Sequence, residues 1–420
     1  MTMDPYLEAL TQACDVAIRE ERHQEVITLL GLMIGRGGDD GMYLYLLGHA
    51  HYLQGRYEAA ETALRASVRV DPTRSEAFND LAASLFRQFR DAEALNYIRQ
   101  SLVLNPDMAE AAETESIWLL RYGRFREAWP KYEARNRTGE GKSFARDFRQ
   151  PQWKGEPIHG KTILLHAEQG LGDSIQFVRY APLVAARGAK VILEVHAGLG
   201  HLCRNLRGVS QLIERGVPLP HFDVQCPLLS LPLAFRTDLD SIPASVPYLA
   251  PDPQRVFTWR ARLGTRRGMR IGIAWSGNRL HRDDRHRSIP LAALAPLLRD
   301  RPEFEFHVVQ TDIRPADRET LRTMPHIHEH GALLRDFSDT AALVSLLDLV
   351  ITVDTAVAHL AGALGWPVWV MLAAVPDWRW MLGRDDSPWY PSMTLFRQRR
   401  RGDWAPVLTE VARQMDDMLS

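Results

Sequence analysis

The segment KTILLHAEQGLGDSIQFVRYAPLVAARGAKVILEV, residues 161–195, decides the fold of the larger part of this chain. Its apolar run at residues 163–167 predicts a buried strand, and the glycine-rich EQGLGDS predicts a tight turn. A helix over residues 174–187 and a second strand over residues 191–195 follow. A strand, a helix and a strand in this order form a βαβ unit, whose strands are parallel. We therefore expect an α/β fold.

Similar phrases continue towards the C-terminus and predict two Rossmann-like lobes, at residues 161–250 and 251–420. A Pro-rich stretch at residues 247–254 separates them, and residues 406–419 predict a terminal amphipathic helix. Ligands of such sheets bind outside the carboxyl ends of the strands. Functional residues are therefore expected in four loops that follow predicted strands: EQGLGDS, WSGNRLHRDDRHRS, VVQTDIR and VDTAVAH.

The first third of the chain contains a repeat. Matching phrases, ALRASVRVDP and YIRQSLVLNP, end at Pro72 and Pro106, 34 residues apart. Small residues recur in phase at Gly48 and Ala82, where two helices can approach closely. The pattern resembles the tetratricopeptide repeat and predicts an all-α array over residues 1–135, with a linker at residues 136–160. Such an array either offers a concave face to a partner or acts as a spacer.

Composition excludes several classes of protein. Lys+Arg total 51 and Asp+Glu 52, so a nucleic-acid binder is not expected. The three cysteines form no CxxC pair, no HExxH occurs and no DxD-type metal motif is evident, so neither a metal site nor a cofactor is expected. Without a signal peptide or a long apolar run, the chain is expected to be cytoplasmic with no transmembrane segment.

Five phrases resemble a bacterial group that fuses tetratricopeptide repeats to a GT-B glycosyltransferase region. They are WKGEP, HAEQGLGDSIQFVRY, DRHRSIPL, VDTAVAHLAGALG and PDWRW with SPWYP. More distantly, the region is similar to the ADP-heptose:lipopolysaccharide heptosyltransferases and, in arrangement, to the protein O-GlcNAc transferases. These resemblances imply an inverting, metal-independent transferase that uses a nucleotide sugar as a substrate.

The EQGLGDS loop is expected to lie on the acceptor side. The heptosyltransferase resemblance makes Asp173 the catalytic base, and Glu168 is a lesser candidate. Gly170 and Gly172 permit close backbone approach to a ligand. Either Asp173 or Ser174 can cap the following helix, so Asp173 as a cap alone stays open.

The VDTAVAH loop is expected to bind the donor. Asp354 and Thr355 lie at a turn, and free N–H groups from Thr355 and Ala356 onward open a helix, which is an anion site. His359, one turn later, could face the same ligand. Alternatively, Asp354 caps the helix and His359 packs in the core.

The WSGNRLHRDDRHRS loop supplies cations in a lobe without lysine. Arg282, Arg285 and Arg287 are candidates for binding the donor phosphates, and Ser276 and Asn278 could add neutral donors. A solvated charged loop is the alternative.

Two departures from the family phrases concern the donor side. Gln310, a further candidate donor contact, is followed by Thr311 where relatives often have Lys. Ala373 and Ala374 precede the PDWRW phrase, where relatives differ. Either change could weaken or alter donor binding.

The predicted function is glycosyl transfer to a protein or glycan acceptor recruited by the repeats. On this reading, deleting residues 1–135 should leave nucleotide binding measurable while transfer collapses. One alternative is an interaction scaffold whose transferase-like region is inactive. A third reading, a sugar-nucleotide epimerase, leaves the repeats unexplained.

Overall fold

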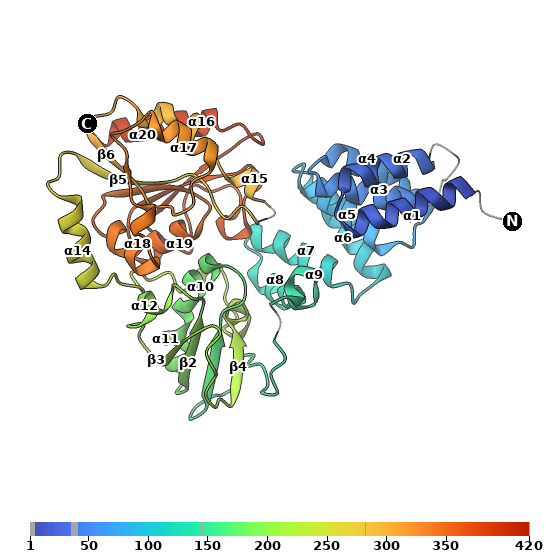
Figure 1. Cartoon of the computed structure of the whole chain (residues 1–420). Helices are drawn as coiled ribbons and strands as arrows, with labels where there is room; N and C mark the ends of the chain where they lie inside the picture. Colours follow the sequence, from blue (N-terminus) through green and yellow to red (C-terminus); the bar gives the residue numbers. More distant parts are fainter. Residues whose placement is uncertain (1–4, 35–40, 145, 282, 420) are drawn as a thin grey trace. The chain divides into compact units, whose positions relative to one another are not determined.

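The computed structural model describes residues 5–34, 41–144, 146–281 and 283–419 (Figure 1). Its contacts divide the chain into two compact units. The first contains Met1–Leu119 and Pro130–Ser143, and the second contains Leu120–Trp129 and Phe144–Ser420. Arg282 lies outside the described residues.

The first unit is a helical array, as the repeat predicts. Each repeat pairs a first helix with a second, antiparallel one. In the first unit these helices are α1 (Pro5–Arg19), α2 (His23–Ile34), α3 (Gly41–Leu53), α4 (Tyr57–Val70), α5 (Ser75–Phe86), α6 (Asp91–Leu104) and most of α7 (Ala109–Arg121). The next helix along the chain, α8 (Phe125–Tyr132), belongs to the second unit up to Trp129 and to the first unit from Pro130. A Cβ at Gly48 would lie 2.4 Å from Leu64 Cγ, so the glycine is required for the close contact of α3 with α4. A 3-10 helix (Glu133–Arg137) follows at the start of the predicted linker, and α9 (Gly139–Lys142) lies within it.

The second unit begins with a four-stranded parallel sheet. Its strand order is β3-β2-β1-β4. The strands are β1 (Thr162–His166), β2 (Lys190–Val195), β3 (Val209–Glu214) and β4 (Val224–Pro227). Between them lie α10 (Leu171–Phe177), a 3-10 turn (Val178–Tyr180), α11 (Ala181–Ala185) and α12 (Gly200–Cys203), with α13 (Leu231–Ala234) after β4. The single helix predicted over residues 174–187 is therefore wrong in its boundaries. It starts three residues earlier, and it is interrupted where Pro182 lacks an N–H group.

The second sheet has six parallel strands in the order β10-β9-β8-β5-β6-β7. They are β5 (Met269–Ala274), β6 (Phe304–Val308), β7 (His328–Glu329), β8 (Leu349–Val353), β9 (Val368–Leu372) and β10 (Met393–Arg397). Figure 1 shows helices on both faces, the arrangement of a doubly wound fold. α16 (Leu291–Leu298), α17 (Pro315–Arg322) and α20 (Ala405–Asp417) cover one face, and α14 (Pro253–Leu263), α18 (Phe337–Val344) and α19 (Ala356–Ala363) cover the other.

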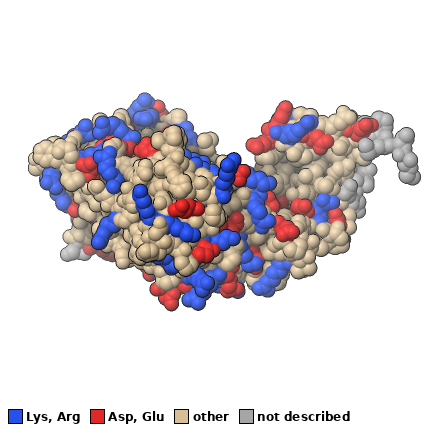
Figure 2. Space-filling view, turned by 90° about the horizontal axis from the view of Figure 1, so that it is seen from below, with Lys and Arg blue, Asp and Glu red and all other residues tan. Residues whose placement is uncertain are grey.

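The surface charge is mixed. On the face shown in Figure 2, basic and acidic side chains are interspersed over the second unit, with no region of a single sign. This distribution matches the near balance of 51 basic and 52 acidic residues.

Candidate functional site

The strand order of the six-stranded sheet locates the candidate site. From β5 the chain moves outward through β6 and β7, and it then returns to place β8 on the other side of β5. The carboxyl ends of β5 and β8 therefore border a topological switch point, where doubly wound sheets bind ligands. The loop after β8 carries Asp354 and Thr355, and the loop after β5 carries the predicted arginines.

The turn after β8 supplies the N-cap of α19. Thr355 is the N-cap, and its Oγ1 accepts a hydrogen bond from Val357 N at 3.3 Å. Its carbonyl accepts from Ala358 N at 3.0 Å. Among the described residues, the N–H groups of Thr355 and Ala356 remain for a ligand. A helix N-terminus of this kind favours an anion.

Asp354 is half-buried beside that helix start. Burial and the neighbouring Asp377 together raise the pKa of its carboxyl to about 6, against the opposite effect of Arg287. With this pKa the carboxyl is still mostly ionised at pH 7 and takes up a proton only as the pH falls through about 6.

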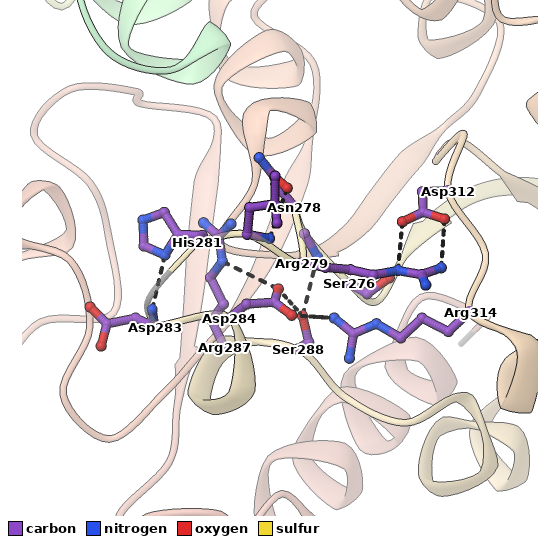
Figure 3. Close-up of polar contacts among 12 residues, drawn as sticks. Ser276, Asn278, Arg279, His281, Asp283, Asp284, Arg287, Ser288, Asp312 and Arg314 are labelled. Carbon is purple, nitrogen blue, oxygen red and sulfur yellow. Dashed lines mark hydrogen bonds and ion pairs between the residues drawn. The ribbon is translucent and has the colours of Figure 1, made fainter. Parts of the chain in front are cut away.

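Ion pairs hold the loop after β5 in place (Figure 3). Arg279 makes a two-pronged contact with Asp312, at 2.9 and 2.8 Å. Arg314 contacts Asp284 and also donates to Ser288 Oγ at 3.1 Å. Much of the positive charge near this loop is therefore used within the protein.

The predicted arginines of this loop differ in where they lie. Arg287 Nη1 donates to the carbonyl oxygen of Asp354 at 3.0 Å, so its guanidinium lies next to the start of α19. Its Nε is buried without a hydrogen bond to a described residue, and Asp284 Oδ1 is 3.9 Å away. Arg285 is exposed and contacts the neighbouring His286. Arg287, rather than Arg285, therefore lies beside the start of α19.

The neutral candidates Ser276, Asn278 and Gln310 serve the protein's own backbone. Gln310 Oε1 accepts from Trp275 N at 2.8 Å, and its amide donates to Ser276 Oγ at 3.0 Å. Asn278 Oδ1 accepts from Leu280 N at 3.0 Å. These bonds fix the loop after β5 against the end of β6. Direct contact of these three residues with a donor stays a prediction.

The turn after β1 places Asp173 on the first turn of α10. Its Oδ2 accepts from Gly170 N at 2.7 Å, which closes a capping interaction. Ser174 is buried behind it. A Cβ at Gly172 would lie 2.8 Å from His359 Cδ2 and 3.5 Å from Ala356 Cα. The close approach at Gly172 is thus to α19, which brings the starts of α10 and α19 together.

Glu168 accepts a hydrogen bond from the backbone within the four-stranded lobe. Its Oε2 accepts from Leu229 N at 3.1 Å, which ties the ends of β1 and β4 together. The side chain is 4% exposed. Within the described residues, this contact supports a role in the sheet.

Arg379 connects α10 with the PDWRW segment. No role was predicted for this residue from the sequence. Its Nη2 donates to Asp173 Oδ1 at 2.5 Å, its Nε to Gln176 Oε1 at 2.7 Å, and its Nη1 to Asp377 Oδ1 at 2.9 Å. The guanidinium lies over the Trp378 ring at 4.3 Å. The PDWRW motif could have identified this contact in the sequence, because it contains both Asp377 and Arg379.

His359 is packed between aromatic side chains. Its Nδ1 lies 3.0 Å from Tyr390 Oη, and its ring stacks on Trp380 with centroids 5.2 Å apart. Burial and the nearby Arg379 together lower the pKa of His359 to about 3, so the imidazole is neutral. Trp378 and Trp389 are also buried, so these aromatic residues form part of the core.

The described parts of the chain contain neither a candidate metal site nor a candidate membrane-spanning helix. They contain no group of three or more His, Cys, Asp or Glu side chains arranged to hold a metal ion. Nor do they contain a helix of the length and apolar character needed to cross a membrane.

The comparison with protein families identifies one unit of the repeat array. Residues 41–74 match the model of the tetratricopeptide repeat. The chain is 27% identical to Protein FlbA of Caulobacter vibrioides over an alignment of 437 residues. The alignment covers 96% of this chain and 71% of that protein.

Two solved structures are similar to this chain over more than half of its length. A mutant O-GlcNAc transferase of Thermobaculum terrenum is 16% identical, with 90% of this chain and 84% of that one covered and a TM-score of 0.34. A family 9 glycosyl transferase of Veillonella parvula is 11% identical, with 62% and 98% covered and a TM-score of 0.46. These identities are too low for a function to transfer from one protein to another.

Proposed function

We propose that the chain is an inverting, metal-independent glycosyltransferase that takes a nucleotide sugar as donor and a protein or glycan recruited by the repeats as acceptor. One observation carries the proposal. The guanidinium of Arg287 and the uncapped N–H groups at the start of α19 meet at the switch point between β5 and β8. A fixed cation beside a helix N-terminus suits the diphosphate of a nucleotide sugar.

The reaction follows from this placement. The acceptor hydroxyl attacks the anomeric carbon, its proton passes to a base, and the bond from that carbon to the diphosphate oxygen breaks. Negative charge then grows on the departing nucleoside diphosphate. Arg287 and the N–H groups of Thr355 and Ala356 are aimed at this charge, which is the requirement for electrostatic stabilisation of the transition state.

Asp173 is the proposed base, on the acceptor side of the same site. Its carboxylate lies 2.5 Å from the guanidinium of Arg379, and a carboxylate is a group that can accept a proton. The same contact occupies one oxygen and the Gly170 cap occupies the other. Because both oxygens are occupied, an inactive transferase-like region in an interaction scaffold is the second candidate function.

Nucleotide binding tests the donor site. We expect a nucleoside diphosphate from a panel of UDP, GDP, CDP and ADP to raise the Tm of the whole protein, with and without EDTA. Arg287→Ala should weaken binding by about tenfold or more, the effect of losing a charged hydrogen bond. Arg285→Ala is the matched control, because that arginine is exposed in the same short helix, α15 (Asp284–Arg287).

Three results would count against the proposal. They are no stabilisation by any nucleotide, binding that requires a divalent ion, or equal losses in the two arginine variants. Transfer from the corresponding nucleotide sugar to proteins of the host lysate, followed by mass spectrometry, separates the enzyme from the scaffold. A scaffold would bind partners and leave the sugar on its nucleotide.

A further inference from the structure

A polar cluster lies on the first helices of successive repeats, apart from the site described above. It consists of Tyr45 and His49 on α3 and Asn79 and Asp80 on α5, and we call it the Tyr45 cluster. Tyr45 and His49 are four residues apart, so they share one face of α3, and their rings lie 5.9 Å apart. The cluster therefore joins two neighbouring repeats by polar side chains.

Asp80 is the centre of the cluster. Its Oδ2 lies 2.6 Å from His49 Nδ1, and its Oδ1 accepts from Asn79 Nδ2 at 3.2 Å. The side chain of Asp80 is largely buried, whereas that of His49 is 41% exposed. The cluster thus runs from the interior of the array to its surface.

Asn79 carries an unsatisfied acceptor. The residue is 7% exposed, and its Oδ1 is buried with no hydrogen-bond partner among the described residues. A buried acceptor without a donor costs about 1–3 kcal/mol, and such groups in native proteins call for an explanation. A ligand that brings an N–H group to the cluster would supply the missing donor.

Acidic side chains dominate the surroundings. Burial raises the pKa of Tyr45, and the carboxylates of Asp80, Glu76 and Glu110 raise it further. Arg74 acts in the opposite direction, but its guanidinium is paired with Asp71 at 2.8 Å. Glu76 and Glu110 are exposed, and Glu110 belongs to α7, the first helix of the next repeat. The local charge therefore suits a cation.

We propose that the Tyr45 cluster binds a lysine or arginine side chain on an extended segment of a partner protein. The cation would take the place of Arg74, whose guanidinium lies 6.0 Å from the centroid of the Tyr45 ring, and would donate to Asn79 Oδ1. Asp80 and Glu76 supply the opposite charge. The inference extends the proposed function, since it names the chemistry by which the repeats would recruit an acceptor.

A charged peptide and its neutral twin test the proposal on the full chain. The probe is fluorescein-labelled octalysine, and the twin has every side chain acetylated, which keeps the length and removes the charge. We expect octalysine to bind with fluorescence anisotropy that falls as salt rises, and the acetylated peptide to bind at least about tenfold more weakly. Equal binding of the two peptides would overturn the proposal.

Substitutions locate the binding. We expect Asp80→Asn, which keeps the shape of the side chain, to weaken octalysine binding about tenfold, and Glu76→Gln to weaken it about threefold. Glu58→Gln is the matched control, because Glu58 is exposed on the second helix of the same repeat pair and should leave affinity within about twofold. Equal losses in all three variants would mean non-specific attraction and would overturn the proposal.

Two features keep the outcome interpretable. Glu76 is exposed, so its variant remains a valid test even if Asp80→Asn unfolds the array, which circular dichroism would reveal. Peptide binding is measured without donor or turnover. The cluster can therefore fail while nucleotide binding succeeds, and the reverse result is equally distinguishable.

Discussion

At the residue scale, the carboxylate of Asp173 makes two contacts, and the choice between a helix cap and a catalytic base stays open. Its carboxylate caps α10 through Gly170 N and binds the guanidinium of Arg379. A cap needs an oxygen in the right place, whereas a base needs a group that can take a proton. Substitutions that separate the oxygen from the basicity can therefore decide between them.

We predict that Asp173→Asn lowers the turnover rate about a hundredfold or more while the nucleotide Kd changes by less than about threefold. The amide oxygen of Asn can still cap α10, but it cannot accept the proton of the acceptor. Steady-state transfer and calorimetric titration of the nucleotide measure the two quantities.

Arg379→Gln is the matched variant for this prediction. It removes the ion pair and leaves the carboxylate of Asp173 in place, so its turnover should exceed that of Asp173→Asn. Equal turnover in both variants would show that Asp173 acts through the ion pair alone and would contradict its role as base.

At the element scale, the turn between the helices of each repeat has the same backbone conformation but different residues. The residue at this position has φ of +74° at Gly55 and +72° at Gly123, where glycine is unstrained. The same position is Glu21 between α1 and α2, with φ of +54°, and Phe89 between α5 and α6, with φ of +62° and a half-exposed ring. The left-handed conformation is unfavourable for such a side chain, so this turn is strained.

We predict that Phe89→Gly unfolds at higher urea concentration than Phe89→Ala, by about 1 kcal/mol in the free energy of unfolding. Both substitutions remove the ring, and only glycine relieves the strain. Far-UV circular dichroism follows the transition. Identical midpoints for the two variants would contradict the strain argument.

Another element, the edge of the six-stranded sheet, holds three stacked histidines. His307 on β6 stacks on His328 and His330, with centroids 4.9 and 5.3 Å apart. Burial and the neighbouring histidines together lower the pKa of His307 to about 3. The folded pKa thus lies below the unfolded value of about 6.5, and the unfolded chain binds more protons below that pH.

We predict that stability is full above about pH 6.5 and falls as the pH drops from there towards the folded pKa of His307. At pH 5 the loss from His307 alone is about 2 kcal/mol. In His307→Phe, which keeps a stacked ring without a titrating group, the dependence of Tm on pH between about 7 and 5 should be weaker. An unchanged slope in this variant would assign the acid sensitivity to other groups.

At the scale of the whole molecule, the second compact unit includes a segment of repeat sequence. Residues Leu120–Trp129 belong to it. Phe125 and Trp129 are buried there, and Trp129 Nε1 donates to Thr237 O at 2.8 Å. Their rings lie 6.0 Å from Trp389 and 5.6 Å from Trp378, respectively. A truncation that removes residues 1–135 would therefore take away part of this core.

We predict that a chain lacking residues 1–106 keeps the nucleotide-dependent rise in Tm and donor hydrolysis, and loses transfer to the acceptor. A chain lacking residues 1–135 should fail to fold, because losing a buried Phe and a buried Trp costs about 3–5 kcal/mol each. Full transfer by the shorter truncation would show that the repeats are not the acceptor platform.

The sequence alone determined the kinds of structure in this chain. A period of 34 residues predicts stacked helical hairpins, and apolar runs followed by glycine-rich turns predict parallel α/β lobes. Both patterns are local, since each arises from which side chains a helix or strand must bury. The Thr355 turn was predictable for the same reason, because a helix start depends on the few residues around it.

Only the tertiary structure decided which side chains meet. Arg379 reaches Asp173 across 206 positions of sequence and Gln176 across 203, and no local pattern specifies such a pair. Likewise, the sequence could not tell Arg287, next to the start of α19, from the exposed Arg285 two residues earlier. The strand order places β8 beside β5, and that pairing determines which loop cation faces which helix start.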